Sequence, residues 1–367
     1  MILQSFGEAY GEICRLAFGL RGDRKFYNQL TQDRPSALRG ARNELLSTTY
    51  FHNFVRGDRR IKRAAVIISG VHGIEGHAGH FLQCQLLREQ AHLALPPDTG
   101  LILIHLVNPW GFSYARRVDE NNVDVNRGCF AAAHGENTRY DKIRALVEPD
   151  CVDQALMAAL RAKISNPEQR RQFFAAAVSG QWHRPTGIFY GGATTCQSGL
   201  NLAAACRDEI FSQLEEIIAI DIHTGLGPRG VGTVLCPLPS DQGTDAERTR
   251  AIFGAGVQFI NVEKSVTTSI AGDFLPAMQR YLPNCKFTGV ALEMGTTTAE
   301  ESFPAMVIEN QLYHFPEKAT DIDPSIIDYA NAFFRRTFAP LDDVLWVKNL
   351  NNAFRNLWQA AIQGLSK

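Results

Sequence analysis

The sequence lacks the features that mark secreted, membrane-bound and nucleic-acid-binding proteins. Its N-terminus has neither the basic segment nor the long apolar segment of an export signal, and no apolar run reaches the roughly 18 residues of a membrane-spanning helix. The eight cysteines form no C-x-x-C motif, and the formal net charge is −1. We therefore expect a cytoplasmic protein with reduced, mostly buried cysteines, and neither nucleic acid nor a membrane as a partner.

Two common catalytic motifs are also missing. The chain contains no H-E-x-x-H motif of helical zinc proteases and no G-x-S-x-G motif, which presents the nucleophile of many serine esterases. What is present is an ordinary globular composition, with 45% hydrophobic and 20% charged residues in a chain of 367. A chain of this kind can bury a large core, in one domain or in two.

The stretch 64–80 combines a predicted strand with a group of polar side chains. Its first five residues are apolar and rich in β-branched types, which indicates a strand buried on both faces. His72 and Glu75 follow where the strand turns into a helix, and residues three apart on a helical turn share one face. They are therefore candidate metal ligands. His77 and His80 lie farther along this helix, and we interpret both as structural residues or as supports for the ligands.

Strands and helices are predicted to alternate along the chain. The clearest apolar runs are predicted strands at 64–68, 101–107, 217–222 and 287–294. Their alternation with helical patterns favours an α/β fold with a largely parallel sheet. Residues 1–47 are expected to be helical, and residues 48–55 are expected to pair with 64–68 as a hairpin at one edge of the sheet.

Two further segments are predicted to be helical. Residues 131–200 indicate a helical insertion that walls or covers a site, and Asn166 and Pro167 are the expected N-cap and first turn of one of its helices. Residues 320–367 indicate two C-terminal helices. The second has an apolar stripe that we assign to the core, formed by Leu350, Phe354, Leu357, Trp358 and Ala361.

More candidate ligands follow the later strands. His223 comes directly after the third predicted strand, and Glu293 lies at the end of the fourth. Parallel strands end at the same edge of a sheet, so these side chains should approach His72 and Glu75. Two histidines and one glutamate form a known ligand set of catalytic zinc, and Glu293 is a candidate general base. Taken singly, a backbone-bonded His223 and an ion-paired Glu293 are the simpler interpretations.

The segment 116–128 is dense in polar residues and contains Arg116, Arg117, Asn126 and Arg127. Its simplest interpretation is a solvated surface loop. Because it follows a buried strand, its side chains could instead converge on a site at the edge of the sheet.

Taken together, these motifs resemble those of the zinc metallocarboxypeptidase superfamily, near its branch of succinylglutamate desuccinylases and aspartoacylases and a bacterial branch of unestablished substrate. The matching motifs keep the superfamily's order and span residues 64–295. They are His72-x-x-Glu75, Asn108-Pro109-x-Gly111, Arg117 to Asp124-x-Asn126-Arg127, Asp221-x-His223 and Glu293-x-Gly295.

The resemblance implies one catalytic domain over residues 1–367. Its fold would be zinc carboxypeptidase-like (phosphorylase/hydrolase-like), with a mixed, largely parallel eight-stranded sheet flanked by helices. The resemblance further implies one Zn²⁺ per chain, held by His72, Glu75 and His223, with Asp221 as a weaker candidate behind them. Nickel or cobalt could replace zinc in purified protein.

The same resemblance implies roles for the remaining residues. Glu293 would be the general base, Arg117 would polarise the scissile carbonyl, and Asn126 and Arg127 would hold a substrate carboxylate. Arg116 is the alternative to Arg117, because the position of a side chain in a loop cannot be derived from strand alternation. Arg127 in a structural ion pair with Asp124 or Glu120 is the simpler alternative.

The implied activity is hydrolysis, by zinc-activated water, of a peptide or amide bond next to a free carboxylate. The substrate would be a small peptide, as for a metallocarboxypeptidase, or an N-acyl amino acid, as for a deacylase. A non-catalytic metal-binding protein on the same fold is a further alternative. The presence of Glu293 and both arginines opposes it, because a scaffold needs none of them.

Overall fold

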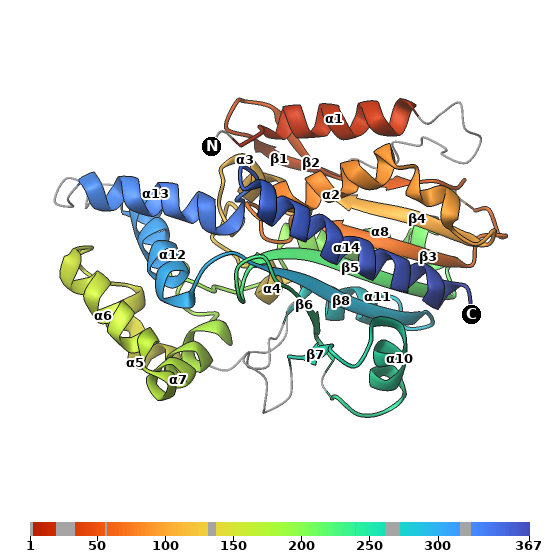
Figure 1. The fold of residues 1–367 in the computed structure, drawn as a ribbon. Helices are drawn as coiled ribbons and strands as arrows, with labels where there is room; N and C mark the ends of the chain where they lie inside the picture. Colours follow the sequence, from red (N-terminus) through yellow and green to blue (C-terminus); the bar gives the residue numbers. More distant parts are fainter. Residues whose placement is uncertain are drawn as a thin grey trace.

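Eight strands form a single mixed sheet in the computed structural model (Figure 1). The structure describes residues 3–19, 34–55, 57–130, 137–238, 240–260, 272–315 and 324–367. The order of the strands across the sheet is β1-β2-β4-β3-β5-β8-β6-β7. Their bounds are β1 Arg34–Arg39, β2 Leu45–His52, β3 Arg63–Ser69, β4 Thr99–His105, β5 Glu216–Gly225, β6 Gly232–Cys236, β7 Gln258–Phe259 and β8 Lys286–Gly295. The predicted α/β fold with a mixed eight-stranded sheet is confirmed.

The four central strands, β4, β3, β5 and β8, run parallel to one another. β2 lies antiparallel beside β4, and β6 lies antiparallel beside β8. The chain leaves β3 for β4 on one side and later returns to β5 on the other side. A crevice forms at the carboxyl ends of strands where the direction of winding reverses in this way, and His72 and His223 come from the two strands at this point.

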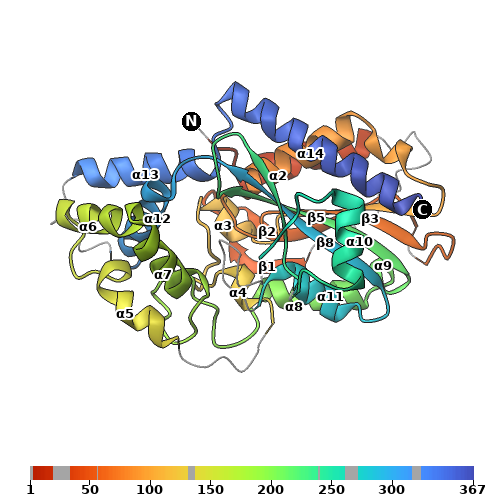
Figure 2. The ribbon, with the colours of Figure 1, turned by 60° about the horizontal axis from the view of Figure 1, so that its bottom comes forward.

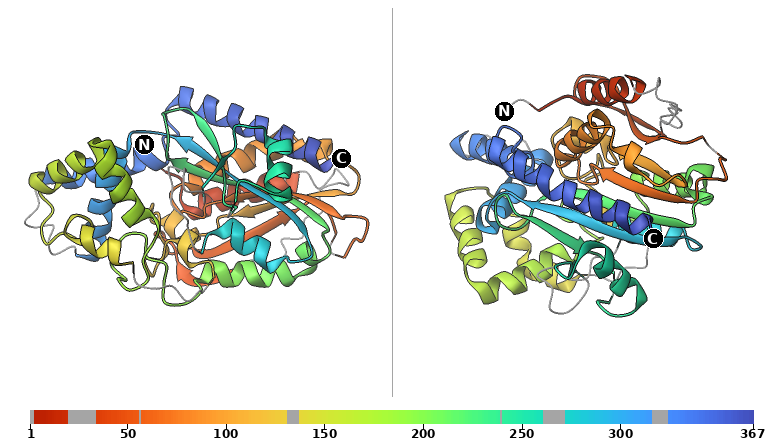
Figure 3. Two further views of the ribbon diagram at one scale, coloured as in Figure 1. Left: turned by 90° about the horizontal axis from the view of Figure 1, so that it is seen from below. Right: turned by 45° about the vertical axis from the view of Figure 1, so that its right-hand side comes forward.

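Helices cover both faces of the sheet, on opposite sides (Figure 2 and Figure 3). α2 (Gly76–Arg88) and α14 (Val344–Leu365) share one apolar core with Ala65 and Ile67 of β3. α8 (Gln197–Arg207) and α11 (Phe274–Tyr281) share the other core with Val66 and Ile68. Alternate residues of a strand point to opposite faces, so both sets of β3 side chains are buried. This accounts for the continuous apolar run in the sequence.

A second group of helices lies beyond the carboxyl ends of the central strands, at the left of Figure 1. It comprises α5 (Thr138–Val147), α6 (Gln154–Ser165), α7 (Pro167–Val178), α12 (Ala299–His314) and α13 (Pro324–Phe338). These helices share an apolar core that also contains Ile74, from the loop that carries His72 and Glu75. The second helical layer is therefore attached directly to the candidate site.

The remaining helices are short or peripheral. They are α1 (Phe6–Gly19), η2 (Ala91–Ala94), α3 (Pro109–Ser113), α4 (Val125–Gly128), α9 (Glu209–Ser212) and α10 (Thr244–Phe253). None of the helices in the described ranges combines the length and the apolar content that crossing a bilayer requires. None of the eight cysteines, which all lie in the described ranges, forms a disulfide, and Cys151 is exposed.

Several local predictions are confirmed. Asn166 caps α7, its side chain accepting hydrogen bonds from the backbone N–H groups of Glu168 and Gln169, and Pro167 is the first helical residue. The apolar stripe of the last helix, predicted at Leu350 and its partners, is buried. His223 differs slightly from expectation, because it lies inside β5 rather than after it, whereas Glu293 lies near the end of its strand as predicted.

Two predictions at the N-terminal side are wrong. Residues 34–39, expected to be helical, form β1 and pair antiparallel with β2. Residues 45–52 pair with β4 and β1, not with β3 as the predicted hairpin required. β3 has a parallel neighbour on each side, so no edge of it is free for a hairpin partner. Pairing across the sheet has overridden proximity in the sequence.

Candidate metal centre

Three side chains converge at the carboxyl edge of β3 and β5. The Nδ1 atom of His72 lies 2.9 Å from Oε1 of Glu75. The Nδ1 atom of His223 lies 3.0 Å from Oε2 of Glu75 and 3.2 Å from Nδ1 of His72. All three residues are buried, with 5% or less of their surface exposed. The three predicted ligands thus form one cluster whose ligand atoms all face the same point.

The loop between β3 and α2 is held in place by backbone contacts. The N–H groups of Gly73 and Ile74 donate to the carbonyls of Arg117 and Arg116, at 3.0 and 2.8 Å. A Cβ atom at Gly73 would lie 2.1 Å from the carbonyl carbon of Gly111. Only glycine permits this approach, which brings the polar segment 116–128 against the loop that bears His72 and Glu75.

A carboxylate lies behind each histidine of the cluster. The Nε2 atom of His72 lies 3.2 Å from Asp124, and the Nε2 atom of His223 lies 2.8 Å from Asp221. A carboxylate only accepts hydrogen bonds, so each Nε2 is the N–H donor. Both Nδ1 atoms face each other and Glu75. Each Nδ1 donates to Glu75 while it carries a proton, and it is the atom that would bind a cation once that proton is lost.

The charges around the cluster also fit a cation. The carboxylates of Glu75 and Asp124 pair with the guanidinium groups of Arg117 and Arg127, and Asp221 pairs with His223. Buried charges are stable when they are compensated. Two histidines and one carboxylate suit a divalent ion of the zinc type. The residues present therefore fit a metal ion.

The pKa values of the cluster respond to the same field. Burial by itself would lower the pKa of His223, but the carboxylates of Asp221 and Glu75 outweigh it and hold that pKa well above its usual value. Burial would raise the pKa of Glu75, yet His72 and His223 bring it below its usual value. The raised pKa of His223 and the lowered pKa of Glu75 both mean that the site favours positive charge next to an ionised Glu75.

Arg117 lies against the cluster. Its Nη1 donates to Oε1 of Glu75 at 3.1 Å, and its Nε and Nη2 both donate to Asp124 at 3.2 Å. Asp124 is fully buried, and it also contacts Arg127 at 3.3 Å. Burial would raise the pKa of Asp124, but Arg127 and Arg117 keep it well below its usual value. Asp124 therefore stays ionised and positions both arginines and His72.

Arg116 is not part of the cluster. Its Nε donates to Glu309 of α12 at 2.6 Å, and its guanidinium lies 3.6 Å from the centre of the Tyr313 ring. Arg116 therefore anchors the second helical layer, and the structure does not support the alternative that it replaces Arg117 at the site. The predicted substrate-binding role of Arg116 is thus not met by its position.

Arg127 and Asn126 lie next to the cluster on α4. Arg127 is 2% exposed, and besides Asp124 it donates to the carbonyl of Val178 at the end of α7. Its Nε atom finds no partner among the residues that the structure describes. The Oδ1 atom of Asn126 accepts from the N–H of Phe274 at 3.1 Å, so its Nδ2 is the donor that it can present to a ligand.

Glu293 lies opposite His223 in the parallel pairing of β5 and β8. Its Oε1 accepts a hydrogen bond from the N–H of Leu226 at 2.8 Å. Burial first, and the charge of Glu75 second, raise the pKa of Glu293 to about 7. A carboxyl group with such a pKa can both accept and release a proton near neutral pH.

The structure adds residues whose roles the sequence did not indicate. Asp124 was noticed only as one element of a motif and as an ion-pair partner, although it orders His72 and both arginines. The sequence feature that could have indicated Asp124 is its position two residues before Asn126. Its side chain accepts a hydrogen bond from the backbone N–H of Asn126 and so caps α4. Phe189 lies under the guanidinium groups of both Arg117 and Arg127, at 5.5 and 5.0 Å. It comes from the insertion, where no motif indicated it.

Comparisons with known proteins give a family and a set of similar structures. The model of a family described as "Protein of unknown function (DUF2817)" matches residues 28–347. No curated protein matches the chain.

Three of the solved structures that are similar to this chain have different descriptions. Carboxypeptidase A from Helicoverpa armigera is 12% identical, with a TM-score of 0.47, over 91% of this chain and 74% of that one. Murein-tripeptide amidase MpaA from Escherichia coli O157 is 15% identical, with a TM-score of 0.37, over 80% and 94%. A protein from Shewanella amazonensis, described as of the succinylglutamate desuccinylase / aspartoacylase family, is 16% identical, with a TM-score of 0.35, over 79% and 73%.

Proposed function

The chain belongs to the DUF2817 family, and we propose that it is a metal-dependent hydrolase that cleaves a peptide or amide bond next to a free carboxylate. The observation that supports this proposal is the convergence of the Nδ1 atoms of His72 and His223 on Glu75. These three residues would hold Zn²⁺. When bound, such an ion polarises a carbonyl group and makes water more acidic.

Glu293 would transfer the proton. One of its oxygens is held by the N–H of Leu226, so the other can receive a proton from the attacking water. The same group would then return that proton to the leaving nitrogen. Its position opposite His223, on the neighbouring strand, supports this assignment.

The two arginines would bind the negative charges of the substrate. Arg117 contacts Glu75 directly, so we assign to it the oxygen of the scissile carbonyl as charge develops there. Asn126 and Arg127 are consecutive residues of α4. Nδ2 of Asn126 and Nε of Arg127 can each donate a hydrogen bond to a ligand. We assign to this pair the free carboxylate of the substrate.

A deacylase of small N-acyl amino acids is the second candidate, and one observation favours it. The last residue of α7, Val178, accepts a hydrogen bond from Arg127, and Phe189 of the insertion lies against both arginines. The helical insertion therefore walls the side of the site where the substrate carboxylate would bind. Such a wall favours small substrates over long peptides.

A hydrolysis screen on zinc-loaded enzyme tests the proposal. The screen pairs short peptides and N-acyl amino acids with their carboxyl-amidated analogues. Charge-assisted hydrogen bonds contribute about 1.5–3 kcal/mol each, so amidation should lower kcat/KM by roughly 10- to 150-fold. Arg127→Lys should reduce the difference in kcat/KM between free and amidated substrates, because lysine lacks the planar guanidinium group that binds a carboxylate through two hydrogen bonds. Arg117→Lys is the matched control and should lower kcat while keeping the preference for the free acid.

Two outcomes would contradict the proposal. Equal hydrolysis of free and amidated substrates by the wild type would oppose the carboxylate assignment. An absence of hydrolysis for every member of the panel, with zinc bound, would oppose the hydrolase itself.

A further inference from the structure

A second group of metal-ligating side chains lies where α1 packs outside α2 (Figure 3). The group consists of Glu12 on α1 and of His80 and Cys84 on α2. His80 and Cys84 are four residues apart, so they share one face of the helix. They are 3% and 1% exposed. Helices normally bury apolar side chains at such a contact, and polar groups there need partners.

The distances within this group match those around one metal ion. The Nε2 atom of His80 lies 3.4 Å from Oε2 of Glu12 and 3.7 Å from Sγ of Cys84, which is also 3.6 Å from Nδ1 of His80. In a tetrahedral zinc site with bonds of about 2.0–2.3 Å, neighbouring ligand atoms are about 3.3–3.6 Å apart. The observed separations are therefore close to those that a shared ion would impose.

His105, the last residue of β4, supports His80 from behind. Its Nε2 lies 3.2 Å from Nδ1 of His80. His105 is fully buried, and its own Nδ1 has no partner among the described residues. One proton is shared between Nε2 of His105 and Nδ1 of His80, and either nitrogen can donate it to the other. We consider the form in which Nδ1 of His80 is the donor. The Nε2 atom of His80 then presents its lone pair to Glu12 and Cys84, as a metal ligand does when a further residue orients it.

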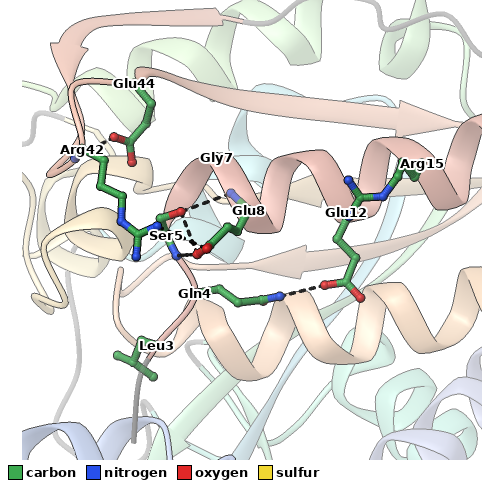
Figure 4. A pocket seen from close by; sticks show the side chains of 9 residues that line it. All are labelled: Leu3, Gln4, Ser5, Gly7, Glu8, Glu12, Arg15, Arg42 and Glu44. Carbon is green, nitrogen blue, oxygen red and sulfur yellow. Dashed lines mark hydrogen bonds and ion pairs between the residues drawn. The ribbon is translucent and has the colours of Figure 1, made fainter.

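Glu12 can bind an ion without losing its other contacts. One of its oxygens pairs with Arg88, and the other accepts from Gln4 at 2.8 Å and faces His80. In Figure 4 the side chain of Glu12 extends from α1 with this carboxylate beside Gln4. Glu12 also lines a surface groove of about 750 Å³, together with Glu8 and Glu44 and with Arg15 and Arg42. Of the three residues of this group, Glu12 is the one that borders the groove.

We propose that Glu12, His80 and Cys84 form a second cation site, for Zn²⁺ or an ion of similar chemistry. A thiolate, an imidazole and a carboxylate favour Zn²⁺ over Mg²⁺ or Ca²⁺, which prefer oxygen ligands. An ion held by both helices fastens α1 to the helix that follows the candidate active site. This site does not depend on the proposed hydrolysis, because it shares no residue with His72, Glu75 and His223.

Cobalt binding distinguishes this site from the first, because only this one contains sulfur. Metal-stripped full-length protein is titrated with Co²⁺, and the near-ultraviolet absorption of sulfur-to-cobalt charge transfer is followed together with the bound cobalt. We expect two cobalt ions to bind per chain. The charge-transfer band should reach its full intensity when the sulfur-containing site is filled, and binding of the other ion should not increase it. Cys84→Ser should remove the band and one ion, whereas Cys206→Ser, at another buried cysteine, should remove neither.

Two further variants keep the test clear of folding defects. Glu12→Gln changes a partly exposed residue and should raise the dissociation constant for the sulfur-bound ion by more than about tenfold, since even groups that only orient ligands contribute 10–100-fold. His223→Ala should lose the other ion and keep the band. The proposal is overturned if wild-type protein shows no charge-transfer band, or if the band survives both Cys84→Ser and Glu12→Gln.

Discussion

At the scale of single residues, the candidate centre depends on carboxylates that lie behind the histidines. Asp124 and Asp221 each accept from the Nε2–H of a histidine. They thereby turn both Nδ1 atoms towards Glu75. Such outer partners fix the orientation and basicity of ligands. The metal-binding geometry is therefore a property of five side chains rather than of three.

Glu293→Gln separates binding from chemistry at this scale. Glutamine keeps the shape of the side chain and can still accept from the N–H of Leu226, but it cannot take a proton. We expect the variant to retain its metal and its fold while kcat falls by about 10²–10⁴-fold. Elemental analysis and kinetics on the same preparation measure both properties. A variant with near wild-type kcat, or one that loses its metal with its activity, would oppose the role of Glu293.

The sequence allowed some of these residues to be predicted and not others. His72 and Glu75 were predictable because a buried strand, a turn and a helix place residues three apart at one point. The choice between Arg116 and Arg117 was not predictable, because it depends on Glu309 and Tyr313 of a distant helix. Neighbouring residues of a loop carry no periodicity that would distinguish them.

At the scale of elements, the loop that carries Arg117 is folded around a buried carboxyl group. Oδ1 of Asp119 accepts from the N–H groups of Asn121 and Val123, at 2.9 and 2.8 Å. Burial first, and the charge of Glu120 second, raise the pKa of Asp119 to about 7. The folded protein thus favours the protonated form of Asp119. Protonated Asp119 stabilises the fold fully at a pH below the usual pKa of aspartate, and this stabilisation is lost as the pH rises through about 7.

Asp119→Asn tests this element. Asparagine keeps the oxygen that accepts both backbone hydrogen bonds but has no charge to bury. Between pH 5 and pH 8 we expect the free energy of unfolding of the wild type to fall relative to the variant by on the order of 1–3 kcal/mol, because a tenfold change in proton affinity corresponds to about 1.4 kcal/mol. Urea unfolding of both proteins at the two pH values measures it. Parallel pH curves for the two proteins would contradict the expectation.

The arrangement of elements was only partly predictable. The four central strands were clear because each is a continuous apolar run buried on both faces. β1 was not predictable, because residues 34–39 are stabilised as a strand by pairing with β2 rather than by an apolar pattern. The hairpin prediction failed for a related reason. β2 pairs with β4, which begins nearly fifty residues later in the sequence, so its partner could not be derived from the neighbouring segments.

At the scale of the whole molecule, two layers meet at the candidate site. The parallel strands bring His72, His223 and Glu293 to one edge of the sheet, and the second helical layer closes against that edge through Ile74, Arg116 and Val178. Sites at this edge are general for open α/β sheets. The second helical layer lies beyond this edge, and we propose that it limits the size of a substrate.

The central claim is that His72, Glu75 and His223 hold the ion on which hydrolysis depends. Zinc titration of metal-stripped enzyme, with hydrolysis of a substrate from the panel as the readout, tests it most directly. We expect the rate to rise from near zero to a plateau for the wild type and for His183→Ala, a histidine control on the insertion, while His223→Ala stays near zero at every zinc concentration. Full activity of the metal-stripped wild type, or restoration of His223→Ala by zinc to the wild-type rate, would contradict the claim.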